Sequence, residues 1–168
     1  MPPVLEPPDT HHIRAAEGWL GLGNLVEAGE ELNKITPAHL SHPAVLSFRY
    51  EIYAKAKHWE IAAEIAGKLV KLTPDQPSAY ICLAYATRRK EGGGIPDARQ
   101  ILTEAEAKFP HEYLIRYNLA CYECQSGNLK LAKKLLERAI VMAGKTDIRK
   151  MALDDPDLEP VWRDIPEI

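Results

Sequence analysis

The stretch that decides the fold is PSAYICLAYATRRKEGGGIPDARQILTEAEAKFP, residues 77–110. In its second half Ala98 lies four positions before Leu102, and Pro110 follows after one helix-length. The same spacing returns along the chain, with alanine steps of 34, 36 and 34 residues between Ala28, Ala62, Ala98 and Ala132. A nearly constant period of this length is typical of stacked supersecondary units, so the sequence predicts a repeat architecture.

Apolar residues recur at helical rather than strand spacing. Ile61, Ile65 and Leu69 lie four positions apart, which places them on one face of a helix. No stretch alternates apolar and polar residues for long, so strands are not expected. The spacing predicts helices over residues 10–22, 25–36, 43–57, 59–72, 77–90, 96–108, 112–126 and 128–142.

Short turns join these helices in pairs. Ser126-Gly127-Asn128 separates two helices by so few residues that they must run antiparallel. The turn at Glu91–Pro96 is two residues longer than its equivalents, which explains the single step of 36 residues. The four prolines within residues 1–8 predict a flexible N-terminus. We therefore expect an array over residues 9–146, made of four helical hairpins in units of about 9–42, 43–76, 77–112 and 113–146.

The last part of the chain, residues 147–168, is expected to cap this array. The apolar spacing that starts at Ile148 predicts a short capping helix, and Asp155 before Pro156 predicts the start of a further helical turn. Leu158, Val161 and Trp162 should fold back over the last unit, because a terminal repeat cannot bury its apolar face alone. An alternative is that acidic residues 154–159 limit access to the basic third and fourth units; we favour the cap.

The repeated segments resemble the tetratricopeptide repeat, whose pattern combines aromatic, Leu-small, Ala, large, Ala and Pro positions over two helices. The third unit matches with Tyr80, Leu83-Ala84, Ala98, Leu102, Ala105 and Pro110. The first unit departs from the pattern with His12 at the first aromatic position. The resemblance implies an all-α, right-handed α-solenoid whose first helices line a concave groove that binds a peptide or helix of a partner protein.

The resemblance also implies which side chains face that groove, all of them on the first helices. They are Ser47, Glu51, Lys55, Ile81, Tyr85, Arg88, Arg89, Leu114, Tyr117, Asn118 and Cys121. Tyrosine and arginine are frequent interface anchors, which suits peptide binding. Members of the family that hold acidic chaperone C-termini use a lysine–asparagine clamp. Two of the corresponding positions are Glu17 and Glu51, so that ligand class is not expected.

Composition restricts the partners and the compartment. The net charge of −3 argues against a general nucleic-acid binder, which usually has a surplus of basic residues. No apolar stretch approaches the length needed to span a membrane, and the N-terminus lacks the features of a secretory signal. Three cysteines within helical segments suit a reducing compartment, so we expect a cytoplasmic protein.

The sequence offers little support for catalysis. Cys121 and Cys124 form a C-x-x-C pair on an expected helix, away from the βαβ context in which such pairs carry redox chemistry. A zinc site would need two more ligands, and only Cys82 is a candidate neighbour. Gly92–Gly94 lies in a helix–helix turn and lacks the preceding strand of a phosphate-binding loop. We expect no enzyme activity, no cofactor and no metal.

The leading interpretation is a protein–protein interaction adaptor or scaffold. The alternative is a secretion-type chaperone or a self-associating scaffold, in which Trp19, Leu20, Leu22 and Leu25 would form a homodimer surface. A thiol- or metal-dependent activity at Cys121 and Cys124 is the third interpretation.

Overall fold

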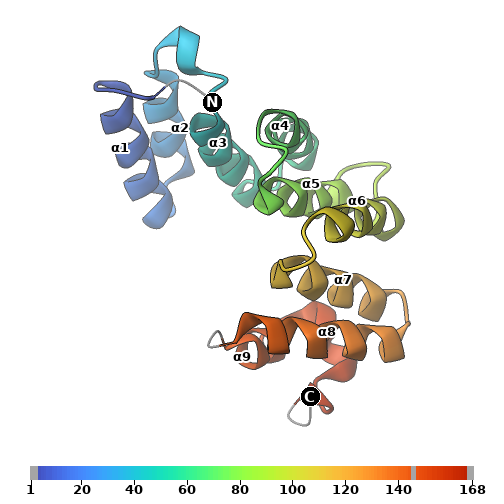
Figure 1. Cartoon of the computed structure of the whole chain (residues 1–168). Coiled ribbons are helices and arrows are strands. Elements are labelled where there is room, and N and C mark those ends of the chain that lie inside the picture. The colour runs from blue at the N-terminus through green and yellow to red at the C-terminus, as the bar shows by residue number, and fades with distance from the viewer. Residues whose placement is uncertain (1–3, 145–146, 166–168) are drawn as a thin grey trace. The chain divides into compact units, whose positions relative to one another are not determined.

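The computed structural model describes residues 4–144 and 147–165, and within these ranges all regular structure is helical. The elements, shown in Figure 1, are α1 (Asp9–Gly21), α2 (Leu25–Asn33), η1 (Pro37–His39), α3 (Pro43–Lys55), α4 (Trp59–Leu72), α5 (Pro77–Arg89), α6 (Ile95–Lys108), α7 (Tyr113–Gln125), α8 (Leu129–Ala143), α9 (Ile148–Leu153) and η2 (Pro156–Val161). This confirms the all-α class. No described helix has the length and apolar character of a membrane span. The expected flexible segment 1–8 lies partly outside the described residues.

The helices of the first part agree with the sequence-based bounds except at the end of α2. That helix was expected to reach residue 36 but ends at Asn33. The reason is a tertiary contact, because the Thr36 backbone N–H donates to Oδ1 of Asp9 at 2.9 Å. Thr36 is thereby held outside the helix, and the short 3-10 helix η1 follows it.

The chain divides into two compact units, residues 1–93 and 94–168. The division falls in the long glycine-rich turn that the sequence analysis placed inside the third hairpin. In the first unit α1 packs against α2, α3 against α4, and α4 against α5; in the second, α7 packs against α8. Three of these pairs, α1–α2, α3–α4 and α7–α8, are consecutive helices joined by the short turns, whereas α4 and α5 belong to neighbouring predicted units.

Three of the hairpin turns share one backbone geometry. The turn residues Gly23, Lys57 and Gly127 all have a positive φ, at 76°, 61° and 83°. In each turn the next backbone N–H returns to a carbonyl of the first helix, from Asn24 to Trp19, from His58 to Tyr53 and from Asn128 to Glu123. This is the Schellman arrangement, which satisfies carbonyls left open at a helix end. The repeat period is therefore visible in the backbone as well as in the sequence.

The alanines that mark the repeat are packing residues. Ala28, Ala62, Ala98 and Ala132 are all fully buried. Residues this small let neighbouring helices approach closely, and larger side chains fill the remaining space. In the first unit one such cluster joins Leu46 on α3, Ile65 and Leu69 on α4, and Ala79 on α5.

In the second unit the C-terminal segment packs against the last two long helices. Asp155 accepts a hydrogen bond from the Asp157 backbone N–H at 3.0 Å, which starts η2. Leu158 and Val161 are fully buried against the unit, and η2 contacts both α7 and α8. The Trp162 indole N–H lies 2.9 Å from the Ala152 carbonyl, which ties η2 to α9.

Candidate functional site

A hollow of about 360 Å³ lies between α3 and α5 in the compact unit of residues 1–93. Each of these helices was predicted to be the first helix of its hairpin. Its lining residues are Pro43, Ala44, Ser47, Tyr50, Leu69, Thr73, Gln76, Ser78, Ala79 and Cys82. The Tyr50 hydroxyl donates to the Cys82 carbonyl at 3.0 Å and so bridges the two helices. Burial raises the pKa of the Tyr50 phenol, which keeps this donor protonated. The hollow is therefore fixed by a direct bond between its two walls.

An aromatic and cationic stack lies at the C-terminal end of α5. The Arg89 guanidinium carbon is 3.5 Å from the Tyr85 ring centroid, and Nη1 of Arg89 donates to the Tyr85 carbonyl at 3.1 Å. Trp59 of α4 meets Tyr85 edge-on, with 5.7 Å between ring centroids, and lies 5.5 Å from the Arg89 guanidinium. These contacts hold a planar, permanently charged group in one orientation at a partly exposed site.

The hollow and the stack lie along one helix face. Ser78, Cys82, Tyr85 and Arg89 are spaced by four, three and four positions along α5, which places them on one side of the helix. At 1.5 Å per residue this stripe, which we call the α5 stripe, is about 16 Å long. A bound segment lying along α5 would meet the hollow at one end and the Arg89 stack at the other.

The other groove positions predicted for the first unit vary in exposure. Ser47 and Glu51 are exposed on α3, and Lys55 pairs with Glu51 at 3.5 Å. The Ser47 hydroxyl donates to the Pro43 carbonyl at 2.9 Å, within its own helix. Ile81 and Arg88 are half-buried. Ser47 lines the hollow, whereas Lys55 and Glu51 form a surface ion pair of small energetic value.

In the second unit the corresponding face is covered by the chain itself. Tyr117 and Cys121 are buried, and both approach Oδ2 of Asp155, the Tyr117 hydroxyl at 2.8 Å and the Cys121 sulfur at 3.5 Å. Burial, with a smaller effect from Cys121 and Asp155, raises the pKa of the Tyr117 phenol. Both side chains were predicted to line an open groove. They are closed to a partner while η2 holds this position.

The two remaining groove positions on α7 are half-buried. The Asn118 side-chain N–H donates to the Leu114 carbonyl at 2.8 Å, a contact within the helix. That bond already engages one donor of the Asn118 amide.

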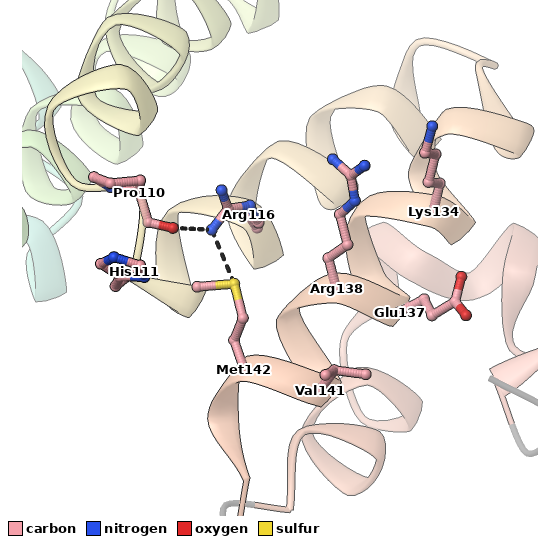
Figure 2. Close-up of a pocket in the computed structure, with 8 residues that line it drawn as sticks. All are labelled: Pro110, His111, Arg116, Lys134, Glu137, Arg138, Val141 and Met142. Carbon is pink, nitrogen blue, oxygen red and sulfur yellow. Dashed lines mark hydrogen bonds between the residues drawn. The ribbon is translucent and has the colours of Figure 1, made fainter.

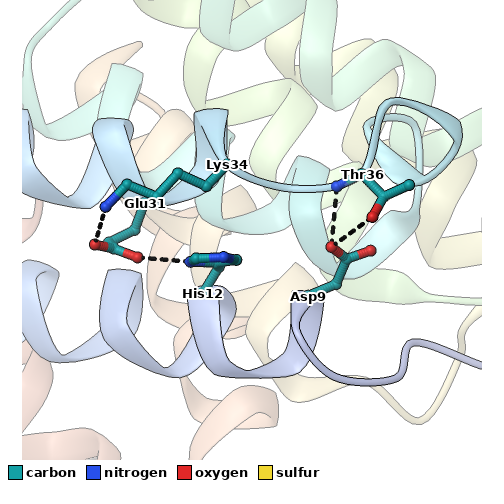
Figure 3. Close-up of polar contacts among 5 residues, drawn as sticks. All are labelled: Asp9, His12, Glu31, Lys34 and Thr36. Atoms are coloured by element: carbon teal, nitrogen blue, oxygen red, sulfur yellow. Dashed lines mark hydrogen bonds and ion pairs between the residues drawn. The ribbon is translucent and has the colours of Figure 1, made fainter.

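Two polar clusters that the sequence analysis missed fix the first hairpin, and Figure 3 shows most of their members. Asp9 is buried at the start of α1 and accepts from the Thr36 backbone and hydroxyl, and His39 Nδ1 lies 2.6 Å from its Oδ2. The Thr36 bond first, and His39 next, lower the pKa of the Asp9 carboxyl. His39 thus ties η1 to α1.

The second cluster involves His12, where the resemblance led us to expect an aromatic residue. Its Nδ1 lies 2.9 Å from Oε2 of Glu31 on α2, and Lys34 donates to Oε1 of Glu31 at 2.7 Å (Figure 3). The Lys34 bond first, then the His12 bond, lowers the pKa of the Glu31 carboxyl. A polar pair therefore joins α1 and α2 where the family pattern has an aromatic.

A third missed cluster lies in the second unit. Glu123 is almost fully buried on α7, pairs with Arg99 of α6, and accepts from the Asn128 side chain at 2.7 Å. A buried carboxylate requires such partners. Its position within the helical period gave no sign of burial, so only the packing of α6 on α7 shows it.

A cationic hollow of about 450 Å³ lies along α8, as Figure 2 shows. Its lining residues are Pro110, His111, Arg116, Lys134, Glu137, Arg138, Val141 and Met142. Arg116 is engaged internally, because Nη1 donates to the Pro110 carbonyl at 2.6 Å and Nε lies 2.9 Å from Glu106. Lys134 and Arg138 instead extend from the exposed side of α8.

The cysteine pair lies in a setting that disfavours nucleophilic chemistry. Cys121 and Cys124 are both buried, and burial, followed by the charges of Asp157 and Asp155, raises the pKa of the Cys124 thiol. A raised pKa reduces the thiolate that redox or metal chemistry needs. Among residues 4–144 and 147–165, no group of three or more histidine, cysteine or acidic side chains is placed to hold a metal ion.

No family model and no curated protein sequence matches the chain. Solved structures do match it. The structure described as MamA 41-end from Desulfovibrio magneticus RS-1 has a TM-score of 0.69 and 16% identity, over 83% of this chain and 77% of that one. A second, the MamA RS-1 ArsTM double mutant, has a TM-score of 0.68 and 16% identity, over 83% and 78%. At this identity the comparison supports the fold alone: the chain shares the helical fold of the MamA structures.

Proposed function

We propose that the chain is a non-enzymatic interaction adaptor that binds a peptide or helix of a partner protein along the α5 stripe. The observation that supports this most directly is the Arg89 guanidinium stacked on Tyr85 beside Trp59. Arginine, tyrosine and tryptophan are the residues that most often dominate binding energy at interfaces. A charged group already held in place loses less entropy when a ligand binds it.

The chemistry of the stripe defines the ligand. Arg89 presents N–H donors that suit a carboxylate, and the hollow beside Cys82 and Ser78 is lined largely by apolar atoms and by hydroxyls. The two features are about 16 Å apart at most along the helix. The expected ligand is therefore a segment that carries an apolar side chain and, several residues away, an acidic one.

Two further properties belong to this proposal. The protein is expected to act without a catalytic step. Cys121 and Cys124 are buried, and within the part of the chain that the structure describes no acidic, histidine or cysteine side chains gather in a group that could hold a metal ion. It is also expected to work in the cytoplasm. None of its three cysteines forms a disulfide, which is the state that a reducing compartment maintains.

The test is a selection of random displayed peptides on the immobilised protein, followed by affinity measurement for the selected sequences. Acidic-plus-apolar peptides should be enriched, and Tyr85→Ala and Arg89→Ala should each weaken their binding about tenfold or more. Arg89→Lys keeps the charge but loses the stacked plane, so it should also weaken binding. Lys68→Ala, at an exposed position of α4, is the matched control. Selected peptides that bind all four variants equally would contradict the assignment.

A further inference from the structure

A second exposed surface lies on α8. Leu131, Lys134, Arg138 and Val141 follow each other at three, four and three positions, so they form one stripe of that helix. All four are exposed; Val141 has 75% and Leu131 40% of its surface accessible. Lys130 adds a further positive charge, and Glu137 is the one acidic residue on the exposed side of α8. We call this the α8 face.

The α8 face contains two hollows in addition to its charged side chains. The 450 Å³ hollow around Arg138 and Val141 lies toward its C-terminal end, and a second hollow of about 720 Å³, lined by Gly127 to Leu131 and Lys134, lies toward its N-terminal end. Lys134 borders both. An apolar side chain placed in either hollow would therefore lie beside a cation.

The first unit carries a surface of the opposite charge. Leu22 and Val26 have 78% and 73% of their surface accessible, and Glu27 and Glu30 are exposed beside them on α2. Two cations lie close to this surface: Lys34 is paired with Glu31, and Arg49 of α3 donates to the Leu32 carbonyl at 3.1 Å. Val26 and Glu30 also border a hollow of about 220 Å³ toward Ile52 and Tyr53 of α3. We call Leu22, Val26, Glu27 and Glu30 the α2 face.

The two faces match in composition. Leu22 lies at the C-terminal end of α1, and Val26, Glu27 and Glu30 follow on α2 after the turn at Gly23. Each offers two aliphatic side chains, and the acids of one complement the cations of the other. Of the surface suggested by the sequence for self-association, Leu20 is buried and Leu22 is exposed, so the contact would use Leu22 and α2 rather than Leu20.

We propose that copies of this chain associate through the α8 face of one copy and the α2 face of another. Because the two faces differ, the contact is heterologous and leaves one face of each kind open, so association can continue beyond two copies unless a ring closes. Exposed ion pairs are individually weak and screened by salt, so the association should be weak and salt-sensitive.

The test measures sedimentation of the full chain over a range of protein concentrations. The average mass should rise with concentration at low salt, and high salt should reduce the rise. Lys134→Glu/Arg138→Glu should weaken association about tenfold or more, and so should Glu27→Lys/Glu30→Lys. An equal mixture of these two variants should associate again. The unchanged α8 face of one variant can meet the unchanged α2 face of the other, and the two reversed faces are complementary as well.

Controls separate this contact from general charge effects and from the α5 stripe. Lys68→Glu/Lys71→Glu changes the net charge as much as the α8 reversal but lies on α4, and it should leave association unchanged. Arg89→Ala should also leave it unchanged, so a failure of the proposed partner site would not affect this result. A mass that does not depend on concentration would overturn the proposal. So would two reversed variants whose mixture stays monomeric.

Discussion

At the scale of single residues, Lys57 has a left-handed backbone conformation that glycine adopts at the equivalent position of two other hairpin turns. Its φ is 61°, while the equivalent turn residues Gly23 and Gly127 have 76° and 83°. A residue with a Cβ is disfavoured in this left-handed region by roughly 1–2 kcal/mol. The second hairpin therefore forms in spite of its turn residue, held by the same hydrogen bonds as the other two.

Lys57→Gly should consequently stabilise the protein by about 1 kcal/mol, since it removes this conformational cost. Urea denaturation followed by circular dichroism measures the change in the free energy of unfolding. Lys68→Gly, in the interior of α4, is the matched control and should destabilise by about the same amount, because glycine is unfavourable within a helix. Stabilisation by both substitutions would show that lysine removal, not backbone geometry, is responsible.

A second prediction at this scale concerns Asp9 and pH. The pKa of the Asp9 carboxyl is lowered from its ordinary value of 3.8, so the charged form is favoured in the folded protein. Its contribution to stability is present above pH 3.8 and is lost as the pH falls through the lower folded value. Asp9→Asn should therefore lower the free energy of unfolding at pH 7. Between pH 5 and pH 2, the free energy of unfolding of this variant should fall by less than that of the natural chain. Urea denaturation across this range measures both; parallel curves would contradict it.

At the scale of elements, the turn between α5 and α6 differs from the other hairpin turns. Gly92 takes the positive φ, at 66°, and the Glu91 backbone N–H donates to Glu60 on α4 at 2.9 Å. That bond is the main cause of the lowered pKa of the Glu60 carboxyl. At Gly93 an added Cβ would lie 2.0 Å from the Thr87 carbonyl oxygen. The extra residues of this turn therefore fold back on α5 and α4.

Gly93→Ala should destabilise the protein by about 1–3 kcal/mol, because the backbone must move to relieve the contact with Thr87. Gly67→Ala is the control. Gly67 lies within α4 with open space around its Cβ position, so alanine should stabilise by about 1 kcal/mol. Thermal unfolding distinguishes the two signs. An equal effect at both positions would show that the Thr87 contact does not constrain the turn.

At the scale of the whole molecule, the C-terminal segment is an integral part of the second unit. It buries Leu158, Val161 and Ile165 and brings Asp155 to Tyr117 and Cys121. Each fully buried aliphatic side chain contributes roughly 1.5–3 kcal/mol. This supports a capping role for the tail over a regulatory one.

Truncation after Leu153 should therefore lower hydrogen-exchange protection across residues 94–144 while residues 4–93 keep theirs, because the two units are separately compact. Leu158→Ala is a milder variant that should destabilise by about 2–5 kcal/mol. Hydrogen exchange read by mass spectrometry locates the loss. A truncated chain that stays fully protected and binds the selected peptides more tightly would instead assign the tail a regulatory role.

The sequence determined the repeat and the helices because both depend on local order. Small residues at a fixed period identify the packing positions, and apolar residues at helical spacing identify the buried sides, as the full burial of Ala28, Ala62, Ala98 and Ala132 shows. The α5 stripe was partly predictable for the same reason, since Tyr85 and Arg89 stand at groove positions. Trp59, from the neighbouring helix, was not included.

Only the tertiary structure decided which of these positions are accessible and which polar groups hold the units together. Asp155 meets Tyr117 across 38 residues, and Thr36 meets Asp9 across 27. Such contacts depend on how the helices pack, and the repeat period of the sequence does not predict them. The sequence therefore specified the faces of each helix, while packing decided that the tail closes the α7 face and leaves the faces of α2, α5 and α8 exposed.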